Sequence, residues 1–87
     1  MHFVYILLCA DASLYVGVTD DLENRIARHK AGRACAYTAA RRPVELVHVE
    51  ELANHLEARR REHQLKGWTR RKKEALVAGD LTLLKRL

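Results

Sequence analysis

The chain opens with two short β-forming runs separated by a turn, and this pair constrains the fold more than any other feature. Residues His2 to Leu8 and Leu14 to Val18 are rich in β-branched and aromatic side chains, which favour strands. The five residues between them include Asp11 and Ser13, both common in turns. The pattern therefore predicts a β-hairpin at the start of the chain.

This hairpin is expected to bring two tyrosines together. Alternate residues of a strand share a face, and a simple hairpin register places Tyr5 within reach of Tyr15. Arg25 and His29 follow, four residues apart in the next predicted element. Two phenols beside two basic side chains are not needed to form the core of a small protein, so they indicate a functional site.

The element that carries Arg25 and His29 reads as a helix from about Asp21 to Ala31. Asp20 is the predicted N-cap, with Glu23 closing a capping box and Gly32 as the stop signal. Leu22 and Ile26 form the expected buried stripe. Arg25 and His29 run beside this stripe, so both are expected at the border between core and solvent.

The rest of the chain predicts an α+β domain. Residues 32–43 read as a loop, and Val44 to Glu50 as a third strand. Two helices follow, capped by Asn54 and Thr69, and a last turn opens at Asp80. The order β-β-α-β-α-α predicts a small three-stranded, largely antiparallel sheet covered by helices. We expect residues 1–87 to form a single domain.

Composition predicts a cytoplasmic protein and argues against a zinc site. No apolar run is long enough to span a membrane, and the start of the chain lacks the pattern of a signal peptide. Cys9 and Cys35 are too few for a disulfide framework, and they predict reduced thiols in a cytoplasmic protein. The other histidines show no zinc-ligand spacing with either cysteine.

Positive charge is concentrated after residue 24. All 16 Lys and Arg residues lie there with seven of the 11 acids, and eight of the 16 fall between Arg59 and Lys73. Such a basic region suits a polyanion such as nucleic acid. A solvated helix face that keeps the protein soluble explains the same composition equally well.

One acidic residue occupies the inward side of this basic region. Glu62 lies four residues after Ala58 and three before Leu65, which places all three on one side of the helix capped by Asn54. A buried carboxylate without a partner is costly. Glu62 therefore requires either a salt bridge to an arginine or a metal ion.

Taken together, these motifs resemble the GIY-YIG nuclease superfamily over most of the chain, from Val4 to about Leu76. The resemblance is nearest to its small stand-alone bacterial members, and the chain is similar to the catalytic module of the excision-repair nuclease subunit. The motifs are Tyr15-Val16-Gly17, the helix start Asp20-Asp21-Leu22-x-x-Arg25-x-x-x-His29, Arg42-Pro43, and Ala58-x-x-x-Glu62-x-x-x-Lys66. In the first signature, Phe3-Val4-Tyr5 lacks the glycine, and Thr38 stands where some members have a second histidine.

The resemblance implies an endonuclease that hydrolyses phosphodiester bonds, most simply in DNA, with Mg²⁺ or Mn²⁺ as cofactor. It makes Glu62 the metal ligand, because hard divalent ions prefer oxygen donors, and Arg25 the phosphate-binding cation. Tyr5 is the general base by analogy, with Tyr15 orienting water or phosphate. His29 is an equally acceptable base on its ordinary pKa. These five residues are expected to line one shallow cleft.

The partner predicted for this chain is nucleic acid. The residues expected to contact it are Arg33, Tyr37, Thr38, Arg41, Arg42, Lys66, Arg70, Arg71, Lys72 and Lys73. Two other functions stay open at this point. One is a non-catalytic module that binds nucleic acid with the same fold, and the other is a domain that recruits a protein partner to supply specificity.

Overall fold

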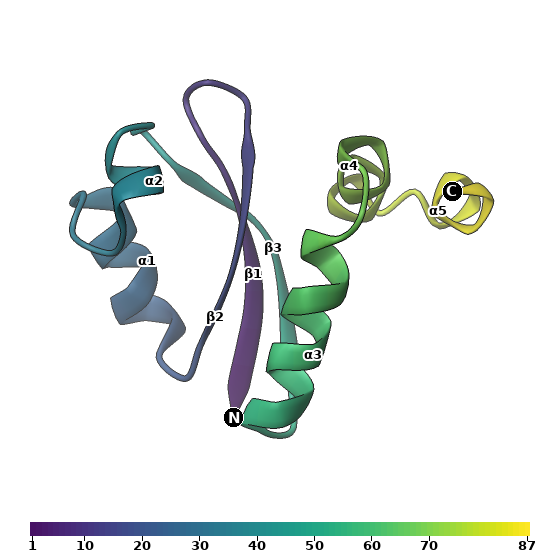
Figure 1. Ribbon diagram of the computed structural model, residues 1–87, viewed down its shortest axis with the longest axis horizontal. Coiled ribbons are helices and arrows are strands. Elements are labelled where there is room, and N and C mark those ends of the chain that lie inside the picture. The colour runs from purple at the N-terminus through teal and green to yellow at the C-terminus, as the bar shows by residue number, and fades with distance from the viewer.

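A three-stranded antiparallel sheet lies at the centre of the protein, with helices on both of its faces (Figure 1). The computed structural model describes all of residues 1–87. Strand β1 (His2–Leu8) is the middle strand, flanked by β2 (Leu14–Thr19) and β3 (Glu45–Leu52). Both pairings are antiparallel, which confirms the α+β fold expected from the sequence.

The predicted hairpin is present, and its register brings the tyrosines together. Tyr5 lies opposite Gly17, and Leu7 lies opposite Tyr15. Residues directly opposite in an antiparallel pair point to the same face, so both tyrosines share one face of the sheet. The turn is held by Asp11, whose carboxylate accepts hydrogen bonds from the Ser13 backbone and hydroxyl.

Five helices follow or separate the strands, and four of them begin at a side-chain cap. They are α1 (Leu22–Lys30), α2 (Ala36–Ala39), α3 (His55–Lys66), α4 (Arg70–Ala78) and α5 (Leu81–Arg86). Asn54, Thr69 and Asp80 cap α3, α4 and α5 as expected. The cap of α1 is Asp21 rather than Asp20, because the Asp21 carboxylate accepts from the Asn24 backbone N–H.

Two further boundaries differ from the sequence-based expectation. Residues 36–39 form the short helix α2 inside the segment predicted as a loop, without a side-chain hydrogen bond at its N-cap Cys35. A helix of one turn has too little hydrophobic periodicity to be recognised in a sequence. Strand β3 begins at Glu45 and continues to Leu52, beyond the predicted Glu50, because its last residues pair with the start of β1.

Each face of the sheet has its own hydrophobic cluster. On one face, Ala58 and Leu65 of α3 pack against Val4, Ile6 and Val16. On the other face, Ile26 of α1 packs with Tyr5, Leu7, Cys9 and Val44. Alternation along β1 explains this division, since its even-numbered and odd-numbered residues point to opposite faces.

Helix α3 is also tied to β3 by a half-buried ion pair. The Arg61 guanidinium donates from Nε to Glu50 Oε1 at 2.8 Å and from a terminal nitrogen to Oε2 at 3.1 Å. Burial alone would raise the pKa of Glu50, but its hydrogen bonds with Arg61 and His48 outweigh burial and lower it. Such a two-point contact fixes orientation as well as distance.

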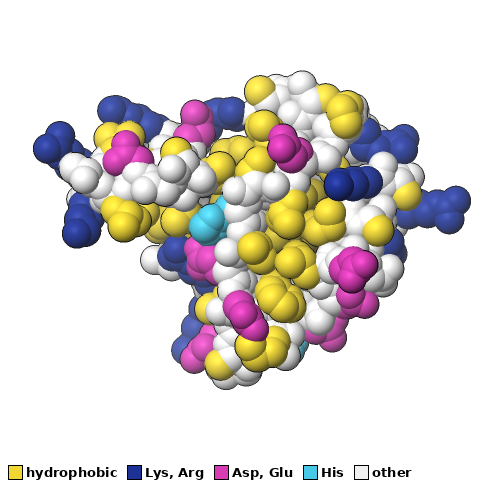
Figure 2. Space-filling view, turned by 180° about the vertical axis from the view of Figure 1, so that it is seen from behind, with side chains coloured by type: hydrophobic (Ala, Val, Ile, Leu, Met, Phe, Trp, Pro, Cys, Tyr) yellow, Lys and Arg dark blue, Asp and Glu magenta, His cyan; other side chains and the backbone are white.

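Hydrophobic and basic side chains occupy different parts of the surface. Seen from behind, hydrophobic side chains gather near the centre of one face, while Lys and Arg project around its margins (Figure 2). No helix has the length and apolar character needed to cross a membrane.

Candidate active site

Three aromatic rings from β1, β2 and α1 meet on the face of the sheet that α1 covers. The ring centroids of Tyr5 and Tyr15 are 6.5 Å apart, and that of His29 lies 5.6 Å from Tyr5 and 5.3 Å from Tyr15. The Tyr5 hydroxyl lies 2.8 Å from His29 Nε2, within hydrogen-bonding distance. The predicted convergence of the hairpin and the first helix is therefore present.

Gly17 makes room for this arrangement. A Cβ atom built on Gly17 would lie 2.4 Å from the Tyr5 hydroxyl oxygen and 2.5 Å from the ring carbon that bears it. Both distances are well inside van der Waals contact. The phenol of Tyr5 therefore lies directly over the β2 backbone at the position where β2 has no side chain.

His29 is held from both sides and is screened from solvent. Only 1 % of the residue is exposed. Its Nδ1 atom lies 2.8 Å from the hydroxyl oxygen of Thr38, which is itself completely buried in α2. The Thr38 oxygen lies 3.4 Å from Cys35 Sγ. The imidazole is thus one member of a chain of four side chains, which come from β1, α1, α2 and the N-cap of α2.

The environment keeps these groups neutral near pH 7. Burial raises the pKa of Tyr5, against the opposing influence of the neighbouring Arg25 guanidinium. Burial is also the main reason why the pKa of Tyr15 is far above its usual value. The pKa of His29 is lowered by burial and by the charges of Arg25 and Arg28. A neutral imidazole can accept a proton, whereas neither phenol ionises readily by itself.

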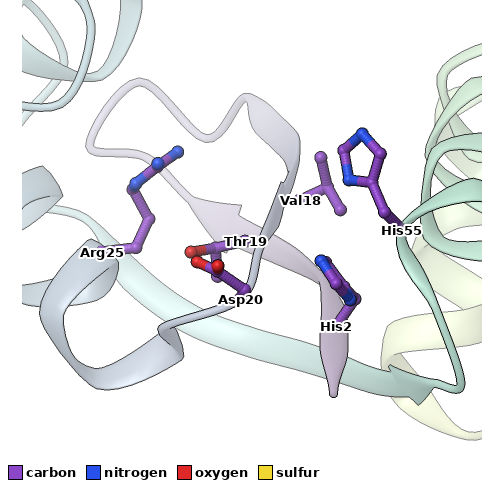
Figure 3. Close-up of a pocket in the computed structure, with 6 residues that line it drawn as sticks. All are labelled: His2, Val18, Thr19, Asp20, Arg25 and His55. Carbon is purple, nitrogen blue, oxygen red and sulfur yellow. The ribbon is translucent and has the colours of Figure 1, made fainter.

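Arg25 reaches from α1 toward the same phenol and also faces solvent. Its guanidinium forms no ion pair with any carboxylate. It lines a pocket of about 210 Å³ together with Asp20, Thr19 and Val18. His2 and His55 form the opposite wall (Figure 3). This unpaired guanidinium is available to an anionic ligand.

Glu62 approaches from a different side of the sheet. It lies on α3, which packs on β1 and on the edge strand β2, across the sheet from α1. Its side chain is 14 % exposed and pairs with Lys66 at 3.2 Å and Arg59 at 3.5 Å. Burial is the main cause of the raised pKa values of Tyr5 and Tyr15, and the Glu62 charge adds to both.

The structure places Tyr5, Tyr15, Arg25 and His29 on one face of the sheet, whereas Glu62 lies on α3, which packs on the other face, although its charge acts on both phenols. That all five line one cleft stays a prediction. Hairpin register and helix periodicity bring Tyr5, Tyr15, Arg25 and His29 together. Those local rules contain no information about the side of the sheet on which a later helix packs.

The residues expected to bind nucleic acid differ in their availability. Tyr37 is 38 % exposed, stacks on Tyr15 and lies under the Arg41 guanidinium, 3.8 Å from the ring centre. Arg41 also pairs with Asp11 at 3.0 Å. Other members engage nearby groups: Arg42 donates to the Ala39 carbonyl, Lys66 pairs with Glu62, Arg70 with Glu74, and Lys72 lies over Trp68. Arg33, Arg71 and Lys73 form no ion pair.

Thr38 is the exception among these residues. It was expected on the nucleic-acid surface, but its full burial keeps it away from any ligand. Its contact with His29 was not anticipated, and neither was the place of Cys35 beside it. The one available signal was that Thr38 stands where some members of the superfamily have a second histidine, which marks the position without revealing its partner.

Comparison with known proteins agrees with this architecture. The family profile described as the GIY-YIG catalytic domain matches residues 1–75. A UPF0213 protein of Natronomonas pharaonis is 49 % identical over 79 residues, covering 91 % of this chain and 93 % of that protein. A UPF0213 protein of Bacillus pumilus is 47 % identical, covering 87 % of this chain and 78 % of that protein.

A solved structure extends the likeness to three dimensions. The solution NMR structure of a UPF0213 protein from Bacillus halodurans superimposes with a TM-score of 0.59 at 44 % identity. The match covers 88 % of this chain and 82 % of the other. With the profile, the relatives and the antiparallel sheet in agreement, the chain belongs to the GIY-YIG nuclease superfamily, among its small UPF0213 members.

Proposed function

We propose that this protein is a divalent-metal-dependent endonuclease that hydrolyses phosphodiester bonds in DNA. The observation that carries the proposal is the hydrogen bond between the Tyr5 hydroxyl and buried His29, with the unpaired Arg25 guanidinium beside them. Phosphodiester hydrolysis requires a base for water, a cation for the phosphate oxygens and help for the leaving oxygen. Tyr5 with His29 supplies the first requirement, and Arg25 the second.

The division of labour between Tyr5 and His29 follows from their hydrogen bonds, because both residues are buried. Both ring nitrogens of His29 are already engaged, by Tyr5 and by Thr38, whereas the Tyr5 hydroxyl also lies beside the Arg25 guanidinium, so the attacking water is assigned to Tyr5. Tyr5 is the group that meets the water, but its raised pKa disfavours an independent phenolate. In the proposed step, Tyr5 takes the water proton on its oxygen as its own proton passes to His29 Nε2. The water oxygen bonds to phosphorus, the bond from phosphorus to the leaving oxygen breaks, and the leaving oxygen takes a proton from solvent.

Arg25 and Tyr15 hold the substrate in this scheme. The Arg25 guanidinium binds phosphate oxygens from its place on the pocket wall shown in Figure 3. Tyr15 keeps its proton because burial raises its pKa, so it serves as a neutral hydrogen-bond donor to water or phosphate. Arg33, Arg71 and Lys73 supply further positive charge for the nucleic-acid backbone.

The donor set fits an ion that needs few protein ligands. No group of three or more His, Cys, Asp or Glu side chains is arranged to hold a metal. Mg²⁺ keeps several waters and binds through one or two carboxylates plus substrate phosphates, so Glu62 alone satisfies its protein requirement. When bound there, Mg²⁺ or Mn²⁺ would neutralise phosphate charge and favour ionisation of water.

A second candidate is a nucleic-acid-binding module without cleavage. It is favoured by the ion pairs of Glu62 with Lys66 and Arg59, which already account for a largely buried carboxylate. The two candidates differ in what Glu62 does. As a metal ligand it is needed for cleavage, whereas as an ion-pair partner it is needed only for stability.

The test compares cleavage and binding for the same variants. Labelled single- and double-stranded DNA is incubated with the purified protein in Mg²⁺ or Mn²⁺, or with chelator, and affinity is titrated without metal. We expect Glu62→Ala to abolish cleavage, a loss of at least about a hundredfold, while binding is kept or tightened. Arg25→Ala should weaken both, since its charge meets phosphate in the ground and transition states.

Glu57→Ala is the matched control, because Glu57 is an exposed acid on the same helix. It should cleave and bind like the wild type. Cleavage by Glu62→Ala at the wild-type rate would reject the metal assignment and leave Glu62 as an ion-pair partner. A wild-type protein that binds DNA and never cleaves it would establish the binding module instead.

A further inference from the structure

A continuous chain of hydrogen-bonding side chains runs from Tyr5 into the interior. It passes from the Tyr5 hydroxyl to His29 Nε2 at 2.8 Å and from His29 Nδ1 to the Thr38 hydroxyl at 2.8 Å. It ends at Cys35 Sγ, 3.4 Å from the same Thr38 oxygen. His29 and Thr38 are each at most 1 % exposed, so water does not supply either of them with an alternative partner.

In such a chain the direction of one hydrogen bond fixes the others. A neutral imidazole has one nitrogen that donates and one that accepts. The Thr38 hydroxyl has a single proton, which points either to His29 Nδ1 or to Cys35 Sγ. If it points to Cys35, the Thr38 oxygen faces the imidazole with a lone pair. Nδ1 must then carry the imidazole proton, and Nε2 is left as an acceptor.

The chemistry of the two hydroxyls favours this direction. A phenol, with an ordinary pKa of about 10, is much more acidic than an alcohol, so the Tyr5 hydroxyl is the stronger donor to an imidazole nitrogen and the Thr38 oxygen is the stronger acceptor from one. The Thr38 oxygen then accepts from His29 Nδ1, and its own proton faces Cys35 Sγ. Burial acts to raise the pKa of the Cys35 thiol, but hydrogen bonds from Thr38, Tyr15 and the Tyr37 backbone outweigh burial and lower it, which agrees with donors directed at the sulfur.

We propose that Thr38 is a positioning residue that keeps the His29 proton on Nδ1 and so holds Nε2 open to the Tyr5 hydroxyl. Its catalytic consequence rests on the proposed function, whereas the tautomer does not. With Nε2 open, the Tyr5 proton transfers to His29, which becomes an imidazolium, as Tyr5 takes the proton of the attacking water. In the other tautomer Nε2 already carries a proton and can only donate to Tyr5.

The first test reads the tautomer directly in the folded 87-residue protein. Long-range proton–nitrogen NMR of ¹⁵N-histidine-labelled protein distinguishes a protonated from an unprotonated ring nitrogen. We expect His29 of the wild type to carry its proton on Nδ1. Thr38→Ser keeps the hydroxyl and should keep this pattern. Thr38→Val keeps the shape and removes the hydroxyl, so the proton should move wholly or partly to Nε2.

The second test reads cleavage of labelled DNA in Mg²⁺. Thr38→Val should lower kcat about ten- to hundredfold with little change in KM, the range typical of residues that orient a functional histidine. Thr38→Ser should restore most of the rate. If the wild type never cleaves DNA, the proposed function fails, yet the NMR measurement still decides the role of Thr38.

Two results would overturn the proposal. One is a wild-type His29 that carries its proton on Nε2, a measurement that requires no variant and does not depend on whether Thr38→Val folds. The other is a folded Thr38→Val protein whose His29 tautomer is the same as in the wild type. In the second case Thr38 would only fill space beside the imidazole.

Discussion

At the scale of single residues, the site depends on Gly17, whose lack of a side chain leaves room for Tyr5. The Tyr5 phenol occupies the space over Gly17, and this contact sets its approach to His29 Nε2. The φ angle of Gly17 is not in the left-handed region, so the backbone itself does not require glycine here. Space for Tyr5 is the physical reason for the residue. The atoms nearest to a methyl group at this position all belong to Tyr5.

We expect Gly17→Ala to displace the Tyr5 hydroxyl and to break its hydrogen bond with His29. Overpacking of this kind costs about 1–3 kcal/mol of folding free energy, which urea unfolding measures. DNA cleavage should fall along with it. In Gly67→Ala, the control, the new Cβ would lie 3.5 Å from the Gln64 carbonyl oxygen, an ordinary contact. Its stability should change by less than about 1 kcal/mol. Equal effects of both substitutions would contradict the role given to Gly17.

At the scale of elements, His29 joins three parts of the fold. It belongs to α1, contacts Tyr5 of β1 and contacts Thr38 of α2. Helix α2 is only four residues long and lacks a side-chain hydrogen bond at its N-cap, so its own hydrogen bonds stabilise it weakly. The neutral imidazole therefore holds a short helix in place, and protonation of the imidazole should weaken that contact.

Folding stability should fall with acidification in a window set by His29. The folded-state pKa of His29 lies below its ordinary value through burial and the charges of Arg25 and Arg28. As pH falls below about 6.5, the unfolded chain binds a proton before the folded protein does, so the free energy of unfolding decreases. The slope approaches about 1.4 kcal/mol per pH unit until the folded-state pKa is reached.

Urea unfolding between about pH 7.5 and about pH 5 measures this slope. His29→Gln should flatten it, even though the variant is less stable overall. His63→Gln replaces an exposed histidine on α3 and should retain the wild-type slope. A His29→Gln protein with an unchanged slope would show that other groups control the acid response.

At the scale of the whole molecule, positive charge is the property expected to determine nucleic-acid binding. The chain carries a formal net charge of +5, and several of its cations are already engaged with acids or aromatic rings. On α4, Arg70 pairs with Glu74 and Lys72 lies over Trp68, whereas Arg71 and Lys73 form no ion pair. The free cations of α4 are the ones that should reach nucleic-acid phosphates.

DNA affinity should fall steeply as salt rises, because bound phosphates release counterions. Each phosphate contact contributes about 0.9 to the slope of log affinity against log salt. Arg71→Ala with Lys73→Ala should therefore lower that slope by about 2. Lys85→Ala with Arg86→Ala, which removes two charges from α5, is the control and should leave the slope near the wild-type value. Equal drops in both would assign the effect to net charge alone.

The sequence by itself determined most helices and strands and the part of the site formed by Tyr5, Tyr15, Arg25 and His29. Alternation in two runs and a turn between them placed Tyr5 and Tyr15 on one face, and a four-residue spacing placed Arg25 and His29 beside the helix stripe. The caps at Asn54, Thr69 and Asp80 followed from local chemistry in the same way. These features depend on neighbours within a few residues, which is why they can be read from a sequence.

Only the tertiary structure decided the positions of Glu62 and Thr38 relative to these four residues. The position of Glu62 depends on which face of the sheet α3 covers, and that choice is made by packing between Ala58, Leu65 and the even-numbered side of β1. The burial of Thr38 and its contact with His29 depend on a one-turn helix folding over α1. Contacts of this kind join residues through space, so no local pattern in the chain records them.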